Sequence, residues 1–128
     1  MSSLMRWPSA DAWLLLAVRD SGRRSLRSVI GTADAINHAI PTHEEFDAAA
    51  KRLSAARLLE VSDDELALTA AGSTLLRSIA ARSWHDEWSR LEAALGERPR
   101  PDESDGHGLS QASFEEAVAK YLHSHGID

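Results

Sequence analysis

The chain has 128 residues, of which 43% are hydrophobic, only 5% are aromatic and none is cysteine. This composition predicts one domain with a helical core rich in alanine and leucine, and the absence of cysteine excludes a disulfide scaffold, a cysteine-ligated zinc site and a thiol nucleophile. The formal net charge is −6, with eight Lys/Arg against six Asp/Glu in residues 1–57 and six against fourteen in residues 58–128, so the sequence lacks the strongly basic half that would indicate nucleic-acid binding.

The sequence predicts a soluble, cytoplasmic protein with no membrane partner. No basic-then-apolar leader opens the chain, and the longest apolar run, residues 12–18, is far too short to cross a bilayer. Residues 1–8 are expected to form an N-terminal extension, in which Leu4, Met5 and Trp7 are apolar enough to pack on the domain or on a second subunit.

A first helix is predicted to begin with Ser9 as its cap. Serine is a favoured N-cap residue, and Asp11 places a negative charge in the opening turn, where the helix dipole favours it. Residues 13–18 are apolar nearly all round the helix, which is typical of a buried central helix. The sequence Asp20-Ser21-Gly22 is expected to end it.

Apolar residues at helical spacing predict a second helix over about residues 26–38, and Pro41 forces the turn that follows it. Thr42 and Glu45 form the capping-box pattern that begins a third helix. One face of this helix is apolar and is expected to be buried. The opposite, exposed face is predicted to carry Glu44, Asp47, Ala48, Lys51 and Arg52.

Two short strands, over residues 58–61 and 66–68, are predicted on either side of a tight acidic turn. Thr69 is expected to cap a fourth helix that runs to Leu95. Its apolar stripe moves round the cylinder after Ile79, so the first half should pack on its own domain and the second half on another partner. The side chains predicted for that second contact are Trp84, Trp88, Leu91 and Leu95.

Residues 96–109 contain prolines, glycines and many charges, which is typical of a flexible linker. Residues 110–128 are expected to form a short C-terminal helix. Ser113 and Glu116 give this helix a capping-box pattern, and Gly126 is expected to end it.

Two short motifs mark the corner after the third helix and the start of the fourth. The first is Arg52-Leu53-x-x-x-x-Leu58-Leu59 and the second is Leu68-Thr69-x-x-Gly72. They resemble the R-L-x-x-x-G-L-V and L-T-x-x-G motifs of the winged helix-turn-helix superfamily, in particular of small bacterial regulators of the MarR and PadR kind. The similarity covers residues 11–95. It implies a mainly α fold with a small β-hairpin wing, an α+β class.

The resemblance also implies a domain organisation for the chain. Residues 9–76 would form the winged helix-turn-helix domain, with residues 42–52 as its recognition helix, and residues 77–95 the second half of a long dimerisation helix. Three features depart from the family pattern. Arg57 stands where glycine is usual at a left-handed helix terminus. Carboxylates occupy the wing tip, Asp63-Asp64-Glu65, and the start of the recognition helix, Glu44, Glu45 and Asp47.

The resemblance implies a dimeric DNA-binding transcriptional regulator as the first function. Its candidate DNA-contacting residues are Arg23, Arg24, Arg27, Thr42, His43, Glu44, Asp47, Lys51 and Arg52. The alternative for the three arginines at residues 23–27 is an ordinary solvated turn, and for the basic pair at 51–52 it is a favourable interaction with a helix C-terminus. The second function is a winged helix that binds another protein and has lost DNA binding, which the acidic surface favours.

A third hypothesis is ligand sensing, with Trp84, His85, Trp88 and Tyr121 around an apolar pocket. The simpler interpretation is that the two tryptophans, with Leu91 and Leu95, form the contacts of a homodimer. No enzymatic activity, metal or cofactor is predicted. The His123-x-His125 pair is isolated, and the histidines at 38 and 43 are interpreted as turn residues.

Overall fold

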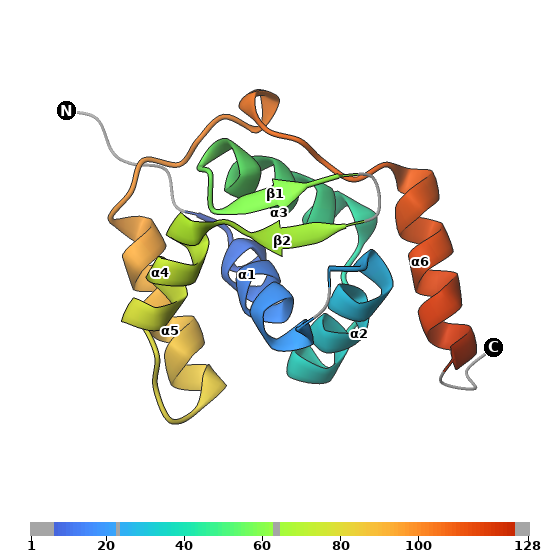
Figure 1. Ribbon diagram of the computed structural model, residues 1–128, viewed down its shortest axis with the longest axis horizontal. Coiled ribbons are helices and arrows are strands. Elements are labelled where there is room, and N and C mark those ends of the chain that lie inside the picture. Colours follow the sequence, from blue (N-terminus) through green and yellow to red (C-terminus); the bar gives the residue numbers. More distant parts are fainter. Residues whose placement is uncertain (1–6, 23, 63–64, 125–128) are drawn as a thin grey trace.

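The computed structural model describes residues 7–22, 24–62 and 65–124. It is mainly helical with one two-stranded antiparallel hairpin (Figure 1), which confirms the α+β class. The elements in chain order are α1 (Ser9–Ser21), α2 (Leu26–Asn37), α3 (His43–Ala55), β1 (Leu59–Val61), β2 (Leu66–Leu68), α4 (Ala70–Ser78), α5 (Trp84–Gly96), the 3-10 turn η1 (Glu103–Asp105) and α6 (Gln111–Ser124). In the described part of the chain, no helix combines the length and apolar character needed to span a bilayer.

Helix α1 is the centre of the core, as its apolar sequence predicts. All of its residues from 11 to 18 are buried, and α2, α3 and α5 pack around it. The predicted cap is wrong, because Ser9 is the first helical residue and its hydroxyl donates to Glu92 instead. The residue before the helix is Pro8, whose carbonyl accepts from the amide of Asp11. Gly22 ends the helix in the left-handed conformation, with φ of 63°.

Helices α2 and α3 match their predicted ranges closely. Helix α2 ends at Asn37, and its C-cap His38 adopts the left-handed conformation with φ of 55°, so the interpretation of His38 as a turn residue is confirmed. The same interpretation of His43 is wrong, because His43 is the first residue of α3. The capping box of α3 is also confirmed, since Thr42 accepts from the amide of Glu45 and the Glu45 carboxylate accepts from the amide of Thr42. Arg57 has φ of 63°, as expected for a residue that takes a glycine position.

The hairpin follows α3 and pairs Leu59 with Leu68 and Val61 with Leu66. Asp63 and Asp64 of the predicted acidic tip lie outside the described residues, while Glu65 is exposed. A third segment joins the edge of β2, because Ser25 forms a bridge with Glu65 and the amide of Leu66 donates to the carbonyl of Arg24. The turn between α1 and α2 is thereby tied to the hairpin.

The predicted long fourth helix is wrong. Helix α4 ends at Ser78, and α5 begins after a turn in which the Ser83 hydroxyl caps it by accepting from the amide of Asp86. The bend allows both apolar stripes to pack on one core, which contains Leu76 of α4 and Leu91 of α5. Burying both stripes against α1 removes the need for the second partner that a straight helix would require.

Residues 97–110, which we call the strap, connect α5 to α6. Figure 1 shows this segment in orange, running across α3 before α6 begins. The predicted Ser113–Glu116 capping box is wrong, because Ser110 accepts from the amide of Ser113 and Glu116 pairs with Lys120 on the helix surface. Gly126, the expected end of the last helix, lies outside the described residues.

Candidate functional site: the outer face of helix α3

Four polar side chains of α3 point away from the core and define its outer face: His43, Asp47, Lys51 and Ser54. Their spacing of four, four and three residues places them in one row along the helix. Two of its members, Asp47 and Lys51, belong to the face that the sequence predicted to be exposed for recognition. In the structure the strap lies along it, with η1 packed directly on α3.

The outer face of α3 holds the strap mainly through the strap's main chain. The Ser54 hydroxyl accepts from the amide of His107 at 2.7 Å, and the Asp47 carboxylate accepts from the amide of Leu109 at 2.9 Å. The Nε2 atom of His43 lies 2.6 Å from the carbonyl oxygen of Leu109, so this nitrogen carries the proton and donates it. Main-chain groups of an extended segment are thus satisfied by side chains of a helix, as they would be by a neighbouring strand.

Two glycines allow the strap to approach α3 this closely. A Cβ atom at Gly106 would overlap the backbone carbonyl oxygen of Lys51, and one at Gly108 would overlap the carboxylate of Asp47. Gly106 has an extended conformation, with φ of −116°, so the requirement for glycine there arises from space rather than from backbone dihedrals. The sequence Gly-x-Gly is therefore a packing motif, whereas its composition indicated a flexible linker.

An apolar anchor follows the second glycine. Leu109 is only 2% exposed and belongs to the core. Phe114, one turn into α6, packs against the rings of His43 and Phe46, at centroid distances of 5.5 Å and 5.9 Å. The end of the strap and the start of α6 are therefore joined to the same core that α3 covers, which fixes the strap over α3.

Arg52 joins α1, α3 and the strap. The sequence placed it on the exposed face as a phosphate contact, but its side chain is 5% exposed, so that prediction is wrong. Its Nε and Nη2 atoms each donate to Asp11 at 2.7 Å, and Nη1 donates to Glu103 at 2.8 Å. Burial raises the pKa of the Asp11 carboxyl while the guanidinium opposes that shift. A charge placed in the core in this way holds elements together and is unavailable to DNA.

Some of the other candidate DNA contacts are exposed, and the rest form bonds within the chain. Arg24, Arg27 and Glu44 are exposed, and Arg23 lies outside the described residues. Lys51 forms an ion pair with Asp47 at 3.1 Å. Three further candidates are bonded within the chain: Thr42, the N-cap of α3, belongs to the capping box, and His43 and Asp47 of α3 bond to the strap. The strap thus covers the part of the predicted recognition surface that includes His43 and Asp47, while Glu44 stays exposed.

The residues predicted for a dimer contact lie on α5 and have different surroundings. Leu91 and Leu95 are fully buried within the single chain, so they are core residues rather than dimer contacts. Trp88 stacks on Trp13 of α1, with ring centroids 6.5 Å apart, and Trp84 covers Trp88 at 5.3 Å. Trp84 is 37% exposed and remains a candidate for an outside contact.

The ligand pocket suggested by the sequence does not include Tyr121. Tyr121 lies on α6. Its ring packs against Gly31 of α2, and its hydroxyl donates to Asp34 at 2.6 Å. Figure 1 shows α6 at the opposite end of the molecule from α5. The tryptophans of α5 and Tyr121 therefore line no common cavity.

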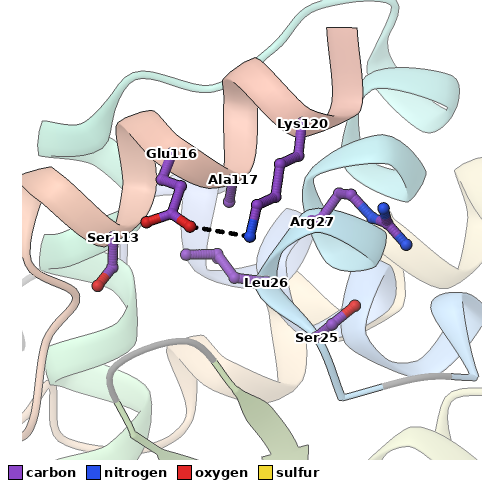
Figure 2. A pocket seen from close by; sticks show the side chains of 7 residues that line it. All are labelled: Ser25, Leu26, Arg27, Ser113, Glu116, Ala117 and Lys120. Carbon is purple, nitrogen blue, oxygen red and sulfur yellow. Dashed lines mark ion pairs between the residues drawn. The ribbon is translucent and has the colours of Figure 1, made fainter. Parts of the chain in front are cut away.

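A separate groove of about 540 Å³ lies between the start of α2 and α6 (Figure 2). Lys120 and Glu116 form an ion pair of 2.8 Å across its α6 wall, above Leu26, and Arg27 extends away from that pair. The groove combines one closed ion pair with two serines, Ser25 and Ser113. No group of three or more metal-binding side chains occurs among the residues that the structure describes.

No family model, curated protein sequence or solved structure matches this chain. The contacts of α3 are thus the main source of functional information. Sequence reasoning missed the strap as part of the site, although Gly106-His107-Gly108-Leu109 carried the signal. An apolar residue directly after two closely spaced glycines indicates a close approach of backbone to a surface as readily as it indicates a linker.

Proposed function

We propose that this chain is a winged-helix domain that binds protein rather than DNA, and that it does so through the outer face of α3. The order α1, bridged turn, α2, α3, β1 and β2 is the order of a winged helix, which supports the fold assignment. The motif at Leu68-Thr69-x-x-Gly72 agrees with it, since Thr69 caps α4 by accepting from the amide of Gly72.

One observation carries the proposal: the outer face of α3 already holds an extended peptide segment. Ser54, Asp47 and His43 bond to the main chain of residues 107 and 109. The Asp47 carboxylate in the middle of this row is unsuited to grip phosphate, because a carboxylate at about 4 Å from a phosphate costs on the order of 1–4 kcal/mol. A surface that bonds peptide amides through a carboxylate is suited to protein.

The basic residues of α3 support the same conclusion. Arg52 is bonded to two carboxylates and Lys51 to one, so each would have to exchange an existing partner for a phosphate. Breaking the Arg52 pair would also leave Asp11 buried with an unpaired charge. Helix α3 therefore has no electrostatic surplus with which to bind DNA.

A DNA-binding regulator is the second candidate, favoured by the exposed arginines Arg24 and Arg27 beside the N-terminus of α2. The two functions are separated by titrating a fluorescent pool of duplex fragments with the protein, from about 50 mM to about 300 mM salt. We expect no binding at tens of micromolar protein at low salt. Binding that falls steeply with salt, and that Arg27→Glu abolishes, would instead establish the regulator.

A further inference from the structure

We infer that the outer face of α3 recognises, in its protein partner, a peptide built like the strap, with a 3-10 turn followed by an extended segment, and that the strap occupies this site in cis and regulates access to it. This inference rests on the proposed function and names its ligand class. The recognised pattern is a carboxylate, then glycine three and five residues later, then leucine. In the strap these positions are Glu103, Gly106, Gly108 and Leu109.

The first part of the recognition is the extended main chain. The bonds from Ser54, Asp47 and His43 reach residues 107 and 109 but not residue 108, which is the alternation of an extended segment. Such bonds depend on the peptide's conformation and not on its side chains, so they are available to a segment of another protein.

The second part is the selection for glycine. Gly106 lies against the backbone carbonyl of Lys51, which is part of a helix and has no room to move aside. Any side chain at this position of a bound peptide would separate it from α3. The site therefore excludes most extended peptides, and this exclusion gives it specificity.

The third part is a pair of side-chain anchors. Leu109 inserts into the core beside α3 and α6, and the Glu103 carboxylate meets the outward Nη1 atom of Arg52. Glu103 is 48% exposed while Arg52 is 5% exposed, so the carboxylate approaches from solvent and the guanidinium is fixed in advance by Asp11. A partner's acidic residue could take the same place.

The strap is connected at both ends, to α5 and to α6. This connection lets it compete with a separate partner peptide for the outer face of α3. A tethered segment of this length acts at an effective concentration on the order of millimolar. If the intrinsic dissociation constant is taken as on the order of 100 µM, which is a working assumption, the strap would be bound about ten times as often as released. A free peptide of the same sequence should then bind the wild-type protein about tenfold more weakly than a protein whose strap is displaced.

The test uses a fluorescein-labelled peptide of residues 101–110 and three full-length proteins: the wild type, Gly106→Ala and Gly96→Ala. The first substitution forces the strap away from Lys51, whereas the second places a methyl group at the end of α5 where no atom outside the adjoining backbone and neighbouring residues lies within 4 Å. We expect Gly106→Ala to bind the peptide about tenfold more tightly than the wild type or Gly96→Ala in fluorescence anisotropy. The same peptide carrying Gly106→Ala should bind none of the proteins.

A second variant weakens the contact between the strap and α3 in a different way, so the test does not depend on the folding of Gly106→Ala alone. Glu103→Ala removes the bond to Arg52 from the solvent side without adding atoms, and it should also strengthen binding of the peptide. Equal and weak peptide binding to all variants, with the strap amides of Gly106→Ala exchanging freely, would overturn the inference and leave the proposed function intact. Salt-dependent binding of duplex DNA to Gly106→Ala would overturn both.

Discussion

Replacement of Arg52 tests whether this residue is a structural cation, as the geometry indicates, or a DNA contact. In Arg52→Met the buried Asp11 loses both of its 2.7 Å bonds to the guanidinium. Removing one member of a buried ion pair costs about 3–5 kcal/mol. For a domain of this size that lowers the melting temperature by about 10 °C or more.

The loss of stability in Arg52→Met should become smaller as the pH falls. Without the guanidinium, the buried Asp11 carboxyl has a pKa raised above that of the unfolded chain, so the folded variant binds a proton more readily. Its free energy of unfolding therefore increases as the pH falls toward the ordinary carboxyl value, and the deficit relative to the wild type narrows between about pH 7 and about pH 5.

Differential scanning calorimetry and urea denaturation of four proteins decide the matter. Lys51→Met removes a half-exposed pair on the same helix and should change stability by less than about 1 kcal/mol. The double variant Asp11→Leu/Arg52→Met should be more stable than Arg52→Met, because no charge is left buried. A loss below about 1 kcal/mol in Arg52→Met would refute the buried pair and reopen a surface role for the arginine.

Three further substitutions test other parts of the account. Arg57→Gly should raise the free energy of unfolding by about 1 kcal/mol, because Arg57 has φ of 63°; an unchanged thermal melt would count against strain at this corner. The Arg19 guanidinium lowers the pKa of the Glu87 carboxyl below its ordinary value of 4.5, so their ion pair stabilises the fold above that pH and is lost as the pH falls through the folded-state pKa. Glu87→Gln should therefore lose less stability on acidification than the wild type, and parallel pH profiles would argue against the ion pair. Self-association through α5 remains a prediction that now rests on Trp84, which is 37% exposed; Trp84→Glu should reduce a dimer to one chain of 14.0 kDa in light scattering, and an unchanged mass would reject the contact.

Local signals of the sequence predicted most of the fold. The capping box of Thr42 and Glu45 and the two strands depend on interactions within a few residues, and both are found in the structure. The left-handed conformation of Arg57, which the family resemblance implied, is found as well. The prediction of one long fourth helix was wrong because a local signal was overlooked. Ser83 with Asp86 was a readable cap signal, but the continuous helical periodicity on both sides concealed the turn.

The candidate site was harder to predict, because it depends on contacts between residues far apart in the chain. Arg52 lies on the edge of the apolar face of α3, and only the position of Asp11 on α1 makes it a buried residue. Nothing local to Asp47 or Ser54 indicates that residues 107 and 109 lie over them. Long-range pairing of this kind leaves no periodic pattern in a single sequence.

Amide hydrogen exchange of His107 and Leu109, followed by NMR, is the most direct test of the claim that the strap covers α3. Both amides donate to side chains of α3, at 2.7 Å and 2.9 Å, so their exchange should be slowed in the wild type and in Gly96→Ala and accelerated in Gly106→Ala. Exchange of both amides at the rate of an unstructured peptide in the wild type would contradict the account, because the outer face of α3 would then be open to DNA.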